Sequence, residues 1–352
     1  MFQAKAMEIS LSEPQAFNLG DFQGKKSINE IEFVLSKKIK NKFEIVILVL
    51  PFQIKSAYKK IKQLCYLELG ILSQIVLTST LEKKGYKSIC SKLVQQIIVK
   101  VGSKLWVPEL SKKLPQNLML VGADICYDRI NKSRSVVAFC ASLDSTFTKY
   151  YNRVVFQKRG KDIIENVRVL FKDSITEYFK ENKKVPECIV YFRDGVTDLQ
   201  EHALRTLEID EVLLSFQDFA LEYKPKLSVI RVEKRIAQKF FHVDEEGYKN
   251  PPSGTLIDTT IVSRDYDFYL IAQNVQRGTA TPTHYKVVYD TTGISSGMLQ
   301  ELVYVLCFSY MNWSGAIRVP APCQYAHKLS VFISQHLNED PKEILRNSLY
   351  YL

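Results

Sequence analysis

Apolar and polar positions follow two different arrangements, one before and one after about residue 115. In the first part, an apolar run over 43–50 is followed by an amphipathic stretch over 54–69, an apolar run over 71–78 and a second amphipathic stretch over 87–101. Short apolar runs predict strands, and amphipathic stretches predict helices. The order strand, helix, strand, helix predicts an α/β unit with a parallel sheet.

The second part opens with three strand-like runs, over 118–124, 135–143 and 150–157, joined by short polar turns that predict antiparallel pairing. A helical stretch over 162–181 then leads to a strand over 187–192, which such a crossover returns parallel to the first strand. Later strands are expected over 226–232, 268–273 and 285–289, and helices over 295–310 and 324–337. This order of strands is the one found in ribonuclease-H-like nucleases.

The chain of 352 residues, 46% hydrophobic, is long enough for two buried cores. Residues 1–30 are weakly patterned, and the stretch 107–116 contains two prolines. We therefore expect a lead-in over 1–42, one domain over 43–115 and a second over 116–352. No apolar run approaches the ~18 residues of a membrane helix, so no membrane association is expected. Seven cysteines without a C-x-x-C pair, and no secretory signal, predict the cytoplasm or the nucleus.

The net charge of +10 belongs to the first third of the chain. Residues 1–115 contain 19 lysines, no arginine and nine acidic residues, whereas the remainder is balanced. Such a basic part suits a polyanion, because lysines exchange counterions for phosphate contacts. The alternative is that these lysines are solvated helix faces without a ligand.

Two acidic residues stand at the ends of predicted neighbouring strands, Asp124 in V-G-A-D and Asp194 in F-R-D-G. A carboxylate there is costly unless it faces a polar cleft or binds a cation, and Mg²⁺ prefers such ligands. Two such ions would stabilise a phosphodiester displacement. The alternative is that each Asp caps a turn.

A second group combines Tyr58 and Lys62, one helical turn apart, with Gln74 and Lys100. An aromatic hydroxyl, an amide and two ammonium groups suit a terminal phosphate. A solvated face explains Lys62 equally well, because it is one of four lysines in eight residues.

Four motifs resemble the Piwi branch of the Argonaute family. They are Y-F-R-D-G-V over 191–196, R-G-T-A-T-P-T-H-Y over 277–285, N-W-S-G-A-I-R-V-P-A-P-C-Q-Y-A-H-K-L over 312–329 and L-Y-Y-L over 349–352. The resemblance runs from about residue 43 to the end and covers the MID and PIWI lobes of that family. It implies a Rossmann-like MID domain followed by a ribonuclease-H-like PIWI domain.

The resemblance also implies a metal site for Mg²⁺ or Mn²⁺ that catalyses target cleavage. Its ligands correspond to Asp124, Asp162, Asp194 and His327. One position departs from the family, which usually has Glu where this chain has Asp162, in R-G-K-D-I-I. Asp is one methylene shorter, and such centres are sensitive to shifts near 1 Å. Glu165 is a second carboxylate within reach along the sequence.

In the MID lobe, the resemblance places the pocket for the 5′ phosphate of a small guide RNA on Tyr58, Lys62, Gln74 and Lys100. Gln96 and the terminal carboxylate of Leu352 correspond to positions near a bound metal. The expected partners are the guide, a complementary RNA or DNA target and silencing proteins.

Two function classes remain open from the sequence. One is a metal-dependent endonuclease that cuts the paired target. The other is a binding module that holds guide and target and recruits silencing partners without cutting. The residue that distinguishes the two classes is Asp162, which stands where the family usually has Glu.

Overall fold

The computed structural model describes residues 13–18, 25–39, 43–52, 55–263 and 266–352. The chain folds as two compact units, the first comprising residues up to 105 together with 335–352, and the second comprising 106–334. The carboxyl-terminal segment joins the first unit because the Lys342 N–H donates to the Tyr66 carbonyl at 3.0 Å and the Tyr66 hydroxyl donates to the Tyr350 carbonyl at 3.0 Å. This arrangement differs from the single range 116–352 expected from the sequence.

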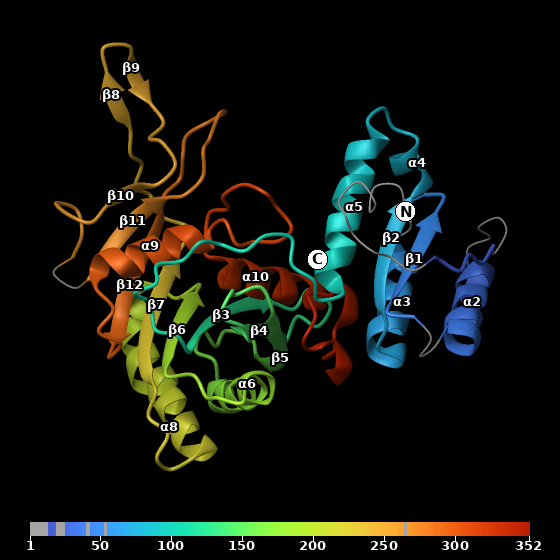
Figure 1. Ribbon diagram of the computed structural model, residues 1–352, viewed down its shortest axis with the longest axis horizontal. Coiled ribbons are helices and arrows are strands. Elements are labelled where there is room, and N and C mark those ends of the chain that lie inside the picture. Colours follow the sequence, from blue (N-terminus) through green and yellow to red (C-terminus); the bar gives the residue numbers. More distant parts are fainter. Residues whose placement is uncertain (1–12, 19–24, 40–42, 53–54, 264–265) are drawn as a thin grey trace. The chain divides into compact units, whose positions relative to one another are not determined.

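The first unit contains a parallel pair of strands, β1 (Ile45–Leu50) and β2 (Leu72–Leu77), with Ile45 opposite Leu72. Between them lie α3 (Lys55–Gln63) and the π-helical turn η2 (Leu64–Leu69), while α4 (Thr78–Leu81) and α5 (Tyr86–Lys100) follow β2 (Figure 1). Gly70 ends η2 with a φ of 69°, a left-handed conformation that favours glycine. The predicted parallel order is confirmed.

The lead-in expected over 1–42 was wrong in one part. Residues 1–12, 19–24 and 40–42 lie outside the described residues, but α2 (Lys25–Val34) and the π-helical turn η1 (Leu35–Ile39) follow one another. Ile31, Val34 and Leu35 are buried, at the spacing of one helix face. Only four of the ten residues of α2 are apolar, so the helical period is weak in the sequence.

The second unit is built on an eight-stranded mixed sheet with the strand order β10-β11-β12-β7-β6-β3-β4-β5. Strands β3, β6 and β7 run parallel to one another, and every other neighbouring pair is antiparallel. The predicted hairpins and the parallel return of β6 beside β3 are therefore confirmed. The strands are β3 (Leu118–Tyr127), β4 (Arg134–Ser142), β5 (Tyr150–Lys158), β6 (Cys188–Asp194), β7 (Lys226–Glu233), β10 (Thr255–Ile257), β11 (Asp267–Ile271) and β12 (Thr283–Asp290).

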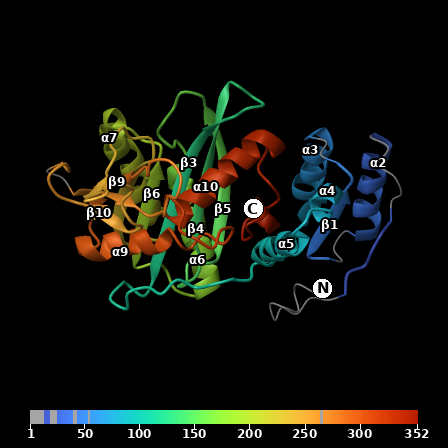
Figure 2. The same ribbon diagram turned by 90° about the horizontal axis from the view of Figure 1, so that it is seen from above.

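Helices cover both faces of this sheet (Figure 1). On one face, α6 (Val167–Asn182) and α8 (Asp210–Phe219) bury Phe171 and Phe216 against the strands. On the other face, α9 (Ser296–Leu306) and α10 (Ala321–Phe332) pack over the strands, and Figure 2 shows α10 lying across β3 and β4. The remaining elements are η3 (Asp198–Gln200), α7 (Glu201–Ala203), η4 (Leu204–Ile209), the hairpin β8 (His242–Asp244) and β9 (Gly247–Lys249), η5 (Ile333–Leu337) and η6 (Glu343–Leu345).

Gly122 of β3 sets the distance between that strand and α10. A Cβ atom at this position would lie 2.3 Å from the Pro322 carbonyl carbon and oxygen and 2.7 Å from the Cys323 nitrogen. No side chain fits in that space. The first turn of α10 therefore rests on the backbone of β3, two residues before Asp124.

The predicted helix over 162–181 begins five residues late, at Val167, so Asp162 lies in an irregular segment. Buried side chains, and not a helix, take up the backbone groups of that segment, as the contacts of Gln157, Arg193 and Glu208 show. The short elements between β6 and β7, and the strands β8 to β10, were not predicted. In the part of the chain that the structure describes, no helix has the length and apolarity to cross a membrane.

Candidate functional site

Lys62, on α3, is a buried cation in the first unit. Its side chain is 3% exposed, and its Nζ donates to the Tyr66 hydroxyl at 2.9 Å and to the Ser73 carbonyl and hydroxyl at 3.0 and 2.9 Å. The Nζ also lies 4.8 Å from the centre of the Tyr66 ring and 5.6 Å from that of the Tyr58 ring. All of these partners are neutral, so the ammonium group of Lys62 has hydrogen-bond acceptors but no counter-ion among them.

Lys100, the last residue of α5, is a second buried cation. It is 2% exposed, and its Nζ donates to the Ser73 carbonyl at 3.1 Å and to Oε1 of Gln74 at 2.9 Å. The amide nitrogen of Gln74 donates in turn to Oε1 of Gln96 at 3.3 Å. The structure therefore brings Lys62, Lys100, Gln74 and Gln96 together around Ser73, at the first half of β2.

The electrostatics of this cluster of buried polar groups favour an anion. Burial lowers the pKa of Lys62 and lowers that of Lys100 strongly, and the neighbouring charge of Lys62 lowers the latter further. Within the described residues, no carboxylate forms an ion pair with either ammonium group. Two buried cations without a counter-ion are costly, and a bound anion with several oxygen atoms would remove that cost.

Tyr58 lies beside Lys62, half-buried, with its ring 5.0 Å from the ring of His336 in an edge-on arrangement. Burial lowers the pKa of His336, and the charges of Lys62 and Lys59 lower it further. For Leu352 the structure gives a backbone bond to the Leu349 carbonyl at 3.2 Å, so the metal role of Leu352 and of Gln96 stays a prediction.

Sequence reasoning missed Tyr66, Ser73, Tyr350 and His336, which surround Lys62 and its neighbours. Tyr66 is one helical turn after Lys62 and seven residues before Ser73. The spacing from Lys62 was a local sign that Tyr66 lies on the same helix face. Tyr350 and His336 come from the other end of the chain, and no local pattern indicates them.

Asp124 and His327 meet in the second unit. Asp124, on β3, is 6% exposed, and its Oδ2 lies 3.2 Å from Nδ1 of His327 and accepts a hydrogen bond from Ser330 at 2.6 Å. His327 and Ser330 are one turn apart on α10, which Gly122 admits close to β3. Burial raises the pKa of Asp124, but the contacts with His327 and Ser330 outweigh it, and the pKa is lowered.

Asp194, the last residue of β6, is 2% exposed and forms an ion pair with Lys234. Burial raises the pKa of Asp194, and the nearby charge of Asp124 adds to this, while Lys234 opposes it. Its buried Oδ2 is the oxygen that pairs with the Lys234 ammonium group. Two buried carboxylates whose charges repel each other fit a divalent cation in their donor chemistry.

Asp162 lies apart from this pair in its contacts. Its carboxylate accepts a hydrogen bond from the side chain of Gln200, which also receives bonds at 2.9 and 3.0 Å from the backbone and hydroxyl of Thr197. Glu165 is engaged by Lys161. Across the described ranges, no three His, Cys, Asp or Glu side chains are grouped closely enough to hold a metal ion. The fourfold ligand set of Asp124, Asp162, Asp194 and His327 therefore stays a prediction.

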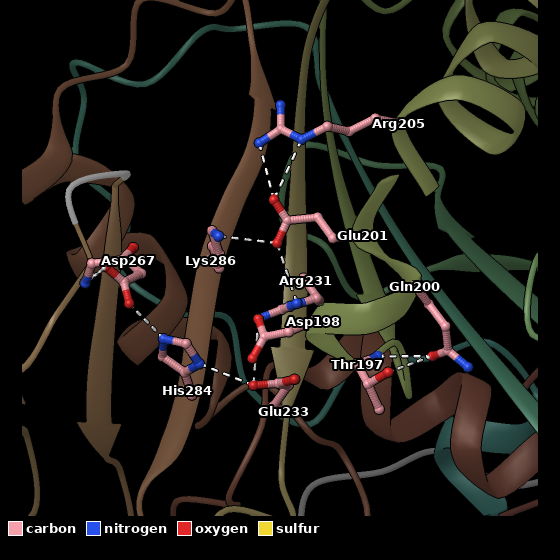
Figure 3. A network of polar contacts seen from close by, with 11 residues as sticks. Thr197, Asp198, Gln200, Glu201, Arg205, Arg231, Glu233, Asp267, His284 and Lys286 are labelled. Atoms are coloured by element: carbon pink, nitrogen blue, oxygen red, sulfur yellow. Dashed lines mark hydrogen bonds and ion pairs between the residues drawn. The ribbon is translucent and has the colours of Figure 1, made fainter. Parts of the chain in front are cut away.

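A network of charged side chains surrounds Arg231 of β7, beside this centre (Figure 3). The guanidinium of Arg231 is fully buried and reaches Asp198 at 2.5 Å, Glu201 at 3.2 Å and Glu233 at 3.6 Å. Lys286 also contacts Glu201, at 3.0 Å. The network ties the segment after Asp194 to the strand that precedes Lys234.

His284 extends this network to β11. Its Nδ1 lies 3.0 Å from Glu233 and its Nε2 lies 2.7 Å from Asp267, while its ring stacks on Tyr269 at 4.4 Å (Figure 3). Burial lowers the pKa of His284, but the hydrogen bonds to Glu233 and Asp267 outweigh it, and the pKa is raised. The imidazole of His284 on β12 therefore joins three strands through its contacts with Glu233 on β7 and Asp267 on β11.

We expect His284 to make the stability of the protein depend on pH. Since its pKa is raised by folding, its contribution is complete below the unfolded value of about 6.5 and is lost as the pH rises through the folded value. Thermal unfolding of wild type and His284→Asn between pH 5.5 and 9 should therefore differ most at low pH, by about 2–4 °C. The exposed His202, changed to Asn, is the control. A difference that does not vary with pH would contradict the expectation.

A family model described as the Piwi domain matches residues 45–338, which is most of the chain. This chain belongs to the Piwi domain family. The resemblance read from the motifs is thereby confirmed.

Piwi relatives agree with this assignment. The chain is 38% identical over 321 residues to Piwi-like protein 1 of Gallus gallus, a match that covers 91% of this chain and 37% of the relative. It therefore spans a little over a third of that relative.

Solved Piwi and Argonaute structures share the fold. Drosophila Piwi superimposes with a TM-score of 0.87 at 27% identity, over 99% of this chain and 48% of that one. An Argonaute of Kluyveromyces polysporus, solved with a guide RNA, superimposes with a TM-score of 0.82 at 22% identity, over 92% of this chain and 43% of that one. The predicted mixed α/β architecture, with a ribonuclease-H-like PIWI sheet, is confirmed.

Proposed function

We propose that this chain binds a small guide RNA through its 5′ phosphate and pairs the guide with a complementary RNA or DNA target for gene silencing. The observation that carries this proposal is the pair of buried ammonium groups of Lys62 and Lys100, which meet neutral groups alone among the described residues. A phosphate monoester carries a charge of about −1.5 to −2 at pH 7, which matches two cations.

The donors around the pocket support a phosphate in particular. Ammonium groups, an amide and the hydroxyl of Tyr58 are donors, and a terminal phosphate has three strong acceptor oxygens. The Kluyveromyces polysporus Argonaute with the same fold was solved with a guide RNA. In the proposed complex, sequence specificity lies in the guide, and the protein reads its phosphate end.

The proposal is tested by comparing guides that differ in one group. A guide with a 5′ phosphate and the same guide with a 5′ hydroxyl are titrated against the protein at fixed ionic strength. We expect the phosphate to improve affinity by roughly 10-fold or more, the worth of one charge-assisted contact. Equal affinities would end the assignment of the pocket.

The salt dependence of guide binding should distinguish phosphate contacts at this site from attraction by the general positive charge of the first third of the chain. Each phosphate-contacting lysine removed from 55–104 should reduce the slope of log K against log salt by about one unit. Lys62→Ala should show this reduction, whereas Lys37→Ala, an exposed lysine of the 1–40 segment, should show less. If both variants change the slope alike, the basic first third reflects composition and not a site.

A second candidate function is metal-dependent cleavage of the paired target. The buried carboxylates of Asp124 and Asp194 favour it, since they repel each other and their donor chemistry suits Mg²⁺ or Mn²⁺. With a metal bound, the centre would supply an activated water for phosphodiester hydrolysis. His327, held beside Asp124, would complete the donor set.

The rival is a guide-binding module that recruits silencing partners and does not cut. The contact between Asp162 and Gln200 favours it, because that carboxylate is already engaged away from Asp124 and Asp194. A labelled target incubated with guide, protein and Mg²⁺ or Mn²⁺ separates the two functions.

A further inference from the structure

The segment that carries Asp162 has no regular structure, yet side chains from elsewhere hold its backbone. Gln157 of β5, 5% exposed, donates to the Lys161 carbonyl at 2.7 Å and to the Ile163 carbonyl at 3.1 Å. Its Oε1 accepts the N–H of Glu165 at 3.4 Å. One amide side chain thus bonds three backbone groups of the segment.

Arg193 holds the same segment from the neighbouring strand β6. Its guanidinium is fully buried and donates to the carbonyl of Asp162 and, at 2.6 Å, to the carbonyl of Asp194. The planar fork of arginine is suited to joining two fixed acceptors. Arg193 therefore links the backbones of two candidate ligands that are 32 positions apart in the sequence.

Glu208, on the π-helical turn η4, holds both Arg193 and the segment. It is fully buried, its Oε1 accepts from Nε of Arg193 at 2.9 Å and from the Tyr191 hydroxyl at 2.7 Å, and its Oε2 accepts the N–H of Ile164 at 2.9 Å. A buried ion pair is costly unless its remaining donors and acceptors are used. Here they are used on the backbone of the Asp162 segment.

We propose that Gln157, Arg193 and Glu208 form a clamp that sets the position of Asp162 relative to Asp194. They are positioning residues for the cleavage centre, and the proposal rests on that proposed function. Along 161–165, every residue has a backbone N–H or carbonyl bonded by one of the three. The backbone of Asp162 is therefore fixed, and a change in the reach of this residue requires its side chain to leave Gln200.

The alternative is an ordinary buried ion pair that stabilises the core and has no effect on the centre. Arg193→Lys separates the two, because lysine keeps a cation beside Glu208 but cannot reach both carbonyls. Gln157→Leu carries no charge change and removes the bonds from the β5 side. Glu208→Gln removes the charge and at most one acceptor. The matched control is Glu211→Gln on α8, a Glu with a 43% exposed side chain that lies 3.7 Å from Arg168.

The experiment uses the full chain and has two readouts besides activity. Hydrogen exchange, followed by mass spectrometry without metal, reports the amides of 161–165. The binding of Mn²⁺, followed by electron paramagnetic resonance, reports the centre. We expect at least tenfold faster exchange in the segment for the three clamp variants. We also expect a Mn²⁺ dissociation constant raised by about 10–100-fold, the usual effect of losing a group that orients a ligand.

The outcomes separate the clamp from the cleavage centre. Segment exchange equal to wild type in Gln157→Leu and Arg193→Lys would overturn the clamp. Faster exchange with an unchanged Mn²⁺ constant would overturn the positioning role and leave a core ion pair. If wild type binds no Mn²⁺, the cleavage centre itself fails and with it the positioning role, while the exchange rates still report whether the clamp exists.

Discussion

Lys100→Met should weaken the binding of a 5′-phosphorylated guide RNA by roughly 10–100-fold and at the same time raise the melting temperature of the RNA-free protein. The first effect follows because a charge-assisted contact is lost, of order 1.5–3 kcal/mol. The second follows because Lys100, 2% exposed, is a buried cation without a carboxylate partner in the described residues. Replacing such a charge by an apolar side chain of similar length is neutral or stabilising.

The stability of the RNA-free protein should also depend on pH because of Lys100. Since folding lowers the pKa of Lys100, the unfolded chain binds more protons in the range below about 10.4. The free energy of unfolding should therefore rise with pH in wild type, and Lys100→Met should reduce that rise.

Calorimetry and guide titration test both effects on the same samples. The matched control is Lys60→Met, an exposed lysine on the same helix as Lys62, which should change neither quantity appreciably. The guide with a 5′ hydroxyl should bind wild type and Lys100→Met more nearly alike. A variant that loses stability and keeps its preference for the 5′ phosphate would show that Lys100 is a structural lysine.

Asp162→Glu should raise the single-turnover rate of target cleavage by on the order of 10²-fold. Asp is shorter by one methylene than the Glu that the family usually has, and a misplacement near 1 Å costs about that factor. The structure adds a reason, because the backbone carbonyl of Asp162 is bonded by Arg193 and its carboxylate by Gln200. The side chain cannot gain reach by a movement of the segment, so wild type should cut slowly or not at all with Mg²⁺.

The controls for this prediction are Asp124→Ala and Asp194→Ala, which should abolish cleavage without loosening guide binding, because both residues lie in the other unit. Mn²⁺ tolerates looser geometry than Mg²⁺, and it should restore part of the wild-type rate. Brisk wild-type cleavage that Asp162→Glu leaves unchanged would show that Asp162 already works as a ligand. Absence of cleavage in both forms, with guide and target bound, would favour the binding module.

The order of strands and helices in both units was predictable from the apolar runs. The lengths of the runs and of their connections determine which strands pair and in which direction. The runs that became β3, β4 and β5 are joined by turns too short for any pairing but antiparallel. The helix α2 and the start of α6 were not predictable in the same way. In α2 only four of the ten residues are apolar, and before α6 the backbone of Asp162 is bonded by residues distant in sequence.

The candidate site was predictable in its residues but not in its environment. Lys62 is one of four lysines in eight positions, and nothing local distinguishes it from its exposed neighbour Lys60. The difference is burial, which depends on β2 and on the carboxyl-terminal segment through Tyr350. The positions of Arg193 and Glu208 similarly depend on bonds between side chains and a remote backbone, which leave no periodic signal.

Gly122 can identify the position of this centre in chains of divergent sequence. Because an added Cβ would lie 2.3 Å from the Pro322 carbonyl, no single substitution at this position is compatible with the present seat of α10. A chain that loses its acidic residues, and with them any cleavage, still needs that glycine as long as the helix stays on the strand. We expect such chains to retain a glycine opposite a helix that begins with proline, even where the carboxylates have been replaced. That glycine would then mark the position of the centre in a sequence alignment.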